Sequence, residues 1–144
     1  MTDTSPDFRW PVRVYWEDTD AGGIVFYANY LKYFERARTE WLRSLGHAQE
    51  AMRADDGVMF IVTDTSVRYR RPARLDDLLD VTVRVQHAGR AQLTVAQQAW
   101  RGPELVAEGS IRIGCVDAGT YRPQPIPMSI TSSITRSIPQ SPPG

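Results

Sequence analysis

Two carboxylates and two glycines lie close together near the start of the chain, in the segment Asp18-Thr19-Asp20-Ala21-Gly22-Gly23. A carboxylate on a loop can attack a carbonyl carbon or act as a general base toward water. The glycines allow backbone conformations that other residues resist. A helix is predicted to begin a few residues later, and its unpaired N–H groups can hold a carbonyl oxygen as it becomes negatively charged. The spacing therefore indicates a site for attack on a carbonyl group around Asp20.

Other interpretations of this segment compete with a catalytic one. On composition alone, a simple turn with capping carboxylates is favoured. Asp18, Asp20 and Gly23 also fit the opening of a calcium loop, but the closing position is Asn29 and a strand is predicted to precede the loop. A phosphate-binding loop does not fit, because neither the P-loop lysine nor the Rossmann glycine spacing follows. No calcium or phosphate loop is therefore expected here.

A long helix over residues 29–45 is predicted to position this segment. Its apolar residues recur at helical spacing, and Gly46 follows as a natural end. Residues 12–17 alternate with a period of two and predict a strand before the loop. A short helical or irregular piece is expected at 48–54, and further strands at 58–69, 79–85, 92–101 and 105–116. One apolar helix followed by antiparallel strands predicts an α+β fold in which the sheet wraps the helix.

Composition limits the classes of function. The 144 residues suit a single domain, and the formal net charge of zero provides no global field for nucleic acid or an anionic membrane. No apolar stretch is long enough to span a bilayer and the polar N-terminus does not resemble a signal peptide, so we expect a cytoplasmic protein. The two histidines, His47 and His87, are isolated, and no metal site is predicted. Residues 129–144, rich in Pro and Ser, are expected to form a mobile tail.

Several segments closely resemble the YbgC-type thioesterases of the Tol–Pal gene cluster, which belong to the 4-hydroxybenzoyl-CoA thioesterase family. The resemblance is carried by residues 8–23, 27–31, 34–40 and 72–77, and it includes the motif Asp-x-Asp-x-x-Gly-x-Val from Asp18 to Val25. It covers roughly residues 8–128. It implies one hotdog domain over 8–128 that hydrolyses acyl-CoA thioesters without a metal or other cofactor.

The resemblance also implies roles for individual residues. Asp20 matches the catalytic aspartate, either nucleophile or general base, and Tyr27 matches the residue whose backbone N–H polarises the thioester carbonyl. Arg90 lies in the loop where members place a cation near the CoA phosphates. Members assemble as homodimers or homotetramers. Supporting roles fall to three neighbours of Asp20, namely Asp18, Gly22 and Gly23.

Some alternatives stay open at this point. YbgC-type members commonly carry His at the position of Tyr27, so the acyl group, short aliphatic or aromatic, is undecided. The thioester can be presented by CoA or by acyl carrier protein. A different class of function is a non-catalytic module that binds acyl carrier protein or an envelope complex. No resemblance to a nucleic-acid-binding module is found.

Overall fold

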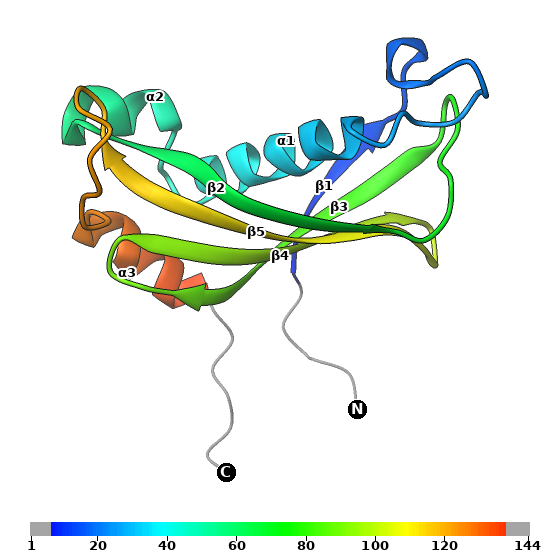
Figure 1. Cartoon of the computed structure of the whole chain (residues 1–144). Coiled ribbons are helices and arrows are strands. Elements are labelled where there is room, and N and C mark those ends of the chain that lie inside the picture. Colours follow the sequence, from blue (N-terminus) through cyan, green and yellow to red (C-terminus); the bar gives the residue numbers. More distant parts are fainter. Residues whose placement is uncertain (1–6, 138–144) are drawn as a thin grey trace.

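The computed structural model of the protein describes residues 7–137. A five-stranded antiparallel sheet curves around one long helix, α1 (Asn29–Ser44), which lies across one face of the sheet (Figure 1). The strands are β1 (Phe8–Arg13), β2 (Val58–Tyr69), β3 (Leu78–Ala88), β4 (Gln92–Arg101) and β5 (Glu104–Asp117), in the spatial order β1-β3-β4-β5-β2. The shorter elements are η1 (Trp16–Asp18), α2 (Gln49–Ala51), η2 (Met52–Asp56) and α3 (Met128–Ser137). The predicted α+β hotdog fold is confirmed.

The core forms where the apolar face of α1 meets the sheet. Tyr33, Phe34 and Ala37 of α1 are fully buried, as are Val95 and Ala99 of β4. Burying this apolar surface supplies most of the stabilisation of the pair of layers. The predicted helix over 29–45 is confirmed almost to its last residue, and the predicted strand over 92–101 coincides with β4.

A buried polar side chain and a glycine fix the distance between α1 and the sheet. Gln97 of β4 is fully buried; its Nε2 donates to the carbonyl of Phe34 at 3.0 Å and its Oε1 accepts from Arg38 at 2.9 Å. Such satisfied buried amides specify one arrangement of the packed elements. On β5, a Cβ at Gly109 would lie 3.2 Å from the Phe34 ring and 3.0 Å from the Ser66 carbonyl. The helix therefore needs a glycine beneath Phe34.

The first strand differs from the prediction for residues 12–17. β1 covers Phe8–Arg13 and is an edge strand, so it tolerates Pro11, which has no N–H to donate. After it the chain turns through η1, because the Asp18 carboxylate accepts a hydrogen bond from the Tyr15 N–H at 2.9 Å. The prediction of a strand as far as Glu17 was therefore wrong, although Val12 and Val14 are both buried as the alternation indicates.

The C-terminal end also differs from the prediction. Residues 129–137, expected in a mobile tail, belong to α3, and the domain extends past residue 128. Ile130 and Ile134, one turn apart, are fully buried, and Ser133 forms a 2.8 Å hydrogen bond with His47 after α1. Two apolar residues on one face are enough to hold this helix on the core. Residues 138–144 lie outside the described part, and no helix within 7–137 is long and apolar enough to cross a membrane.

Candidate active site

The loop between β1 and α1 is closed by Asp18. This carboxylate is buried; it accepts from the Tyr15 N–H at 2.9 Å and from the Asn29 side-chain amide at 3.3 Å. The Asp18 carbonyl accepts from the same amide at 3.1 Å and from the Phe26 N–H at 2.9 Å. The buried carboxylate therefore joins both ends of the loop to the first residue of α1.

Asp20 stands at the exposed tip of this loop, in a tight turn. Its N–H donates to the carbonyl of Ile24 and its carbonyl accepts from the Gly23 N–H, both at 2.9 Å. One carboxylate oxygen, Oδ1, accepts from the Gly22 N–H at 2.8 Å. No hydrogen bond to the other oxygen is found among residues 7–137. Asp20 therefore has one oxygen that orients it and one that faces no protein donor.

Gly22 and Gly23 are each required in the loop for a different structural reason. Gly23 has a φ of +81°, in the left-handed region that glycine adopts without strain. At Gly22 the limit is space, because a Cβ there would lie 3.2 Å from Asp20 Oδ1. Gly23 shapes the turn, and Gly22 leaves room for the carboxylate.

The start of α1 presents free donors beside this loop. The helix has no side-chain cap, and the N–H groups of Asn29 and Tyr30 donate to the carbonyls of Phe26 and Tyr27. The N–H groups of Tyr27 and Ala28 find no acceptor in the described part of the chain. Since the positive end of the helix dipole also lies here, these two groups can stabilise an anion.

A mostly apolar pocket of about 240 Å³ opens next to Tyr27. Tyr69 at the end of β2 packs edge-on against Tyr27, with ring centroids 6.1 Å apart, and lies 5.6 Å from the ring of Tyr30. Burial raises the pKa of both Tyr30 and Tyr69, so these phenols stay neutral at neutral pH. The remaining lining residues are Ile24, Val25, Arg70, Arg71 and Pro72.

The buried hydroxyl of Tyr33 lies close to the Asp18 carboxylate. Tyr33 is fully buried, and no residue within 7–137 accepts a hydrogen bond from its Oη or donates one to it. Burial raises its pKa strongly, and the negative charge of Asp18 raises it further. Tyr33 therefore stays un-ionised next to the carboxylate that closes the loop.

The structure brings five of the predicted site residues together and leaves one apart. Asp18, Asp20, Gly22, Gly23 and Tyr27 share one loop at the end of the sheet where β3 begins. Arg90 follows the other end of β3, which at 11 residues is about 36 Å long. Figure 1 shows the two ends on opposite sides of the molecule. Within one chain, Arg90 is not part of the site around Asp20.

The sequence did not lead us to Asn29 or to the pocket lined by Tyr27, Tyr30 and Tyr69, which we call the tyrosine pocket. A buried-face position at the start of the helix that carries an amide instead of an apolar side chain was a usable signal for Asn29. No local pattern connects Tyr69 with Tyr27 and Tyr30, because strand and helix meet only in the folded chain. Within residues 7–137, no three His, Cys, Asp or Glu side chains lie close enough to form a metal site.

Comparisons with known proteins identify the family of this chain. The model of the thioesterase-like superfamily matches residues 14–134. The acyl-CoA thioester hydrolase YbgC of Escherichia coli O6:H1 is 41% identical over 126 residues, covering 87% of this chain and 93% of that protein. The acyl-CoA thioesterase YbgC of Haemophilus influenzae is 38% identical, covering 88% and 93%.

Solved structures give the same result. A probable thioesterase from Bartonella henselae superposes with a TM-score of 0.82 at 28% identity, over 85% of this chain and all of that one. Sequence and fold agree over the segment that contains both the Asp20 loop and the start of α1. The chain therefore belongs to the thioesterase-like superfamily, and its relatives include the YbgC acyl-CoA thioesterases.

Proposed function

We propose that this protein hydrolyses acyl-CoA thioesters to a free acid and CoA, with Asp20 as the catalytic carboxylate. One observation carries the proposal. The same loop holds a carboxylate with one unbonded oxygen and the free N–H groups of Tyr27 and Ala28. Relatives at 38% and 41% identity are named as acyl-CoA thioesterase and acyl-CoA thioester hydrolase. The pocket beside Tyr27 offers space for an acyl group.

Two mechanisms use the same residues. As a general base, Asp20 takes a proton from water while the water oxygen bonds to the thioester carbon. The carbonyl oxygen becomes negative and is held by the Tyr27 N–H at the start of α1. Breaking the C–S bond then releases a thiolate, which receives the proton. As a nucleophile, an oxygen of Asp20 bonds to the carbon, the thiolate leaves, and water cleaves the resulting anhydride.

The same proposal includes a homodimer formed through β2. This strand is 12 residues long and lies at an open edge of the sheet, with Val62 half exposed. The opposite edge, β1, is half as long and carries Pro11. An unpaired strand edge of this length is a ready site for another strand. Antiparallel pairing of two β2 edges would turn the Arg90 end of one subunit toward the Asp20 end of the other, which would let Arg90 contact CoA bound by the other subunit.

The decisive experiment measures free thiol released from a panel of acyl-CoA thioesters, short aliphatic and aromatic. We expect turnover without added metal or cofactor, by a protein that cell fractionation finds in the cytoplasm. No thiol release from any acyl-CoA or acyl carrier protein substrate would reject the hydrolase and favour a binding module. Light scattering tests the assembly, and an active monomer would reject the edge-paired dimer.

A further inference from the structure

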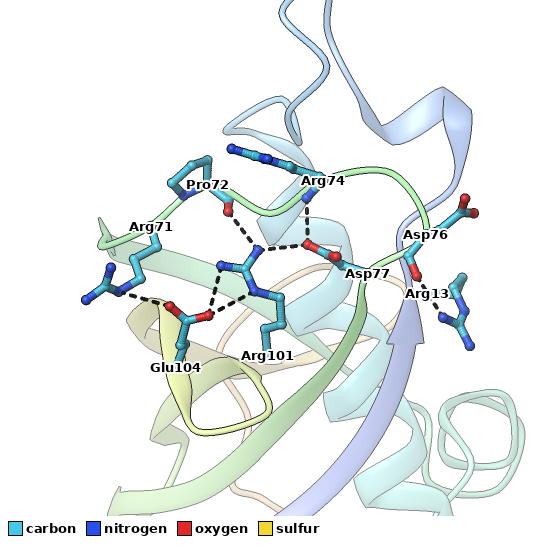
Figure 2. A network of polar contacts seen from close by, with 8 residues as sticks. All are labelled: Arg13, Arg71, Pro72, Arg74, Asp76, Asp77, Arg101 and Glu104. Carbon is cyan, nitrogen blue, oxygen red and sulfur yellow. Dashed lines mark hydrogen bonds and ion pairs between the residues drawn. The ribbon is translucent and has the colours of Figure 1, made fainter.

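A network of arginines and carboxylates lies next to the Asp20 loop, where β4 turns into β5 (Figure 2). At its centre, Arg101 donates to Asp77 Oδ2 at 2.8 Å, to the Pro72 carbonyl at 3.1 Å and to Glu104 at 3.3 Å. Burial opposes ionisation of Asp77, but the hydrogen bond and charge of Arg101 outweigh the effect of burial. The pKa of the Asp77 carboxyl is therefore lowered. These contacts use the donors of Arg101 and hold it in one place.

Two other arginines of the network keep unused donors. Arg71 reaches Glu104 only at 3.7 Å, and 62% of its side chain is exposed. The Arg74 guanidinium has no hydrogen bond or ion pair within the described residues, although its backbone N–H donates to Asp77 at 2.9 Å. In Figure 2 the Arg71 guanidinium lies at the outer side of Glu104, and the Arg74 guanidinium lies above Arg101 with no contact drawn to it. By contrast, Arg70 is paired with Glu108 at 2.7 Å.

These side chains surround a cavity of about 460 Å³ lined by Arg71, Pro72, Arg74, Asp77 and Arg101. The cavity adjoins the tyrosine pocket, because Arg71 and Pro72 line both. It is also tied to the catalytic loop, since Arg74 forms a β-bridge with Ile24, whose carbonyl accepts from the Asp20 N–H. A long ligand can therefore place one end beside Tyr27 and an anionic end between Arg71 and Arg74.

We propose that Arg71 and Arg74 bind a phosphate of the arm that carries the thioester. The inference rests on the proposed function and names its carrier subsite within the same chain. An arginine guanidinium offers paired N–H donors that match the oxygens of a phosphate, and two arginines with unused donors around one cavity can hold a phosphate from two sides. The phosphate belongs either to the diphosphate of CoA or to the phosphodiester that joins phosphopantetheine to acyl carrier protein.

The first test measures CoA binding by calorimetry at low salt, which requires no turnover. The Arg71→Gln, Arg74→Gln double variant is compared with the parent and with Arg112→Gln, which removes an exposed arginine from β5. We expect CoA affinity to fall at least about tenfold in the double variant, with less loss at high salt, and to stay unchanged in the control. Equal CoA affinity in the parent and the double variant would overturn the assignment.

The second test uses substrates with and without phosphate. The double variant should raise KM for an acyl-CoA at least about tenfold with little change in kcat, because a remote contact stabilises ground and transition states equally. The matching acyl-pantetheine, which has no phosphate, should show a much smaller loss, and Arg112→Gln should hydrolyse both substrates as the parent does. An equal loss on both substrates would indicate a damaged site and reject the inference.

Acyl carrier protein distinguishes the two phosphate sources. A loss with acyl-CoA alone assigns the subsite to a phosphate that only CoA carries, and a loss with acyl carrier protein as well assigns it to the pantetheine phosphate that both carriers share; both outcomes support the inference. Should the parent release no thiol at all, the proposed function fails, while the calorimetric result still decides whether Arg71 and Arg74 bind phosphate.

Discussion

Two Asp-Ala-Gly turns lie at opposite ends of this molecule (Figure 1), one beginning at Asp20 and one at Asp117. Their local geometry is nearly the same. Asp20 accepts a hydrogen bond from the Gly22 N–H at 2.8 Å, and Asp117 accepts one from the Gly119 N–H at 2.9 Å. Each is the common turn in which an aspartate bonds to the backbone two residues later.

The surroundings of the two turns differ. Asp117 Oδ2 also accepts from the Thr120 N–H at 2.8 Å, and these backbone hydrogen bonds lower the pKa of its carboxyl. Its own N–H donates to the Arg122 carbonyl, so the turn closes on itself. Within residues 7–137 the carboxylate of Asp20 accepts a hydrogen bond only from the Gly22 N–H, and it stands beside free N–H groups and a pocket. The same sequence motif thus forms a structural turn at one end and a candidate catalytic loop at the other, and neighbouring elements make the difference.

Replacing each aspartate by asparagine tests this comparison most strongly. Asp20→Asn keeps the shape of the side chain but removes the charge needed by a base or nucleophile, so kcat should fall by about 10²–10⁴-fold. Asp117→Asn should hydrolyse acyl-CoA at the parent rate. Steady-state thiol release, with circular dichroism to check folding, measures both. Near-parent turnover by the Asp20→Asn protein would show that the catalytic assignment is wrong.

The far end should matter for stability instead. Ile134 of α3 is almost fully buried, and Ile134→Ala leaves a cavity that should lower the free energy of unfolding by about 2–4 kcal/mol. Urea denaturation measures this change. Because α3 lies at the end of the sheet remote from Asp20, kcat of the folded variant at low temperature should be unchanged. A large loss of kcat in the still-folded variant would contradict the separation of the two ends.

The glycines of the two turns sharpen the comparison further. A Cβ at Gly22 would lie 3.2 Å from Asp20 Oδ1, and one at Gly119 would lie 3.3 Å from Asp117 Oδ2. Gly22→Ala should push the Asp20 carboxylate from its position and lower kcat about tenfold. Gly119→Ala meets the same crowding and should affect only stability, by about 1 kcal/mol or less. Equal effects of Gly22→Ala and Gly119→Ala on kcat would mean that crowding at residue 22 does not disturb catalysis.

The smallest expected effect is the pH dependence of the far turn. The folded-state pKa of Asp117 lies below its unfolded value, so its ionised form stabilises the fold above about pH 4. That contribution is lost as the pH falls through the folded-state pKa. The unfolding midpoints of the parent and Asp117→Asn should therefore differ at pH 7 and converge in acid. A difference that is constant with pH would reject this explanation.

Much of the fold could be predicted because its elements obey local rules. The apolar spacing of α1 and the alternation in β4 and β5 are long and regular, and their bounds were predicted within one or two residues. The first strand was misplaced in the prediction because β1 is an edge strand, in which Pro11 is tolerated. α3 was missed because Ile130 and Ile134 are the only large buried residues among 128–134, and their burial depends on a core formed by distant elements.

The candidate site was predictable only as far as one loop extends. Asp18, Asp20, Gly22, Gly23 and Tyr27 are near each other in sequence and remain so in space. Arg90 was selected by resemblance, and its position relative to Asp20 depends on the course of β3 and on assembly with a second chain. The arginine network and the tyrosine pocket combine residues from three or more elements. Their proximity is a property of the folded sheet.

The position of the start of α1 depends on the small size of Gly109. The helix is about 24 Å long, and Phe34 rests on the sheet near its first third, where a methyl group at residue 109 would lie only 3.2 Å from the Phe34 ring. A side chain at residue 109 would press against Phe34 and tilt α1 about its contacts with the sheet. The displacement would be carried to the Tyr27 end, although residue 109 touches neither Tyr27 nor Asp20. The alignment of Tyr27 with Asp20, the groups that we propose as catalytic, thus depends on the size of one residue in β5.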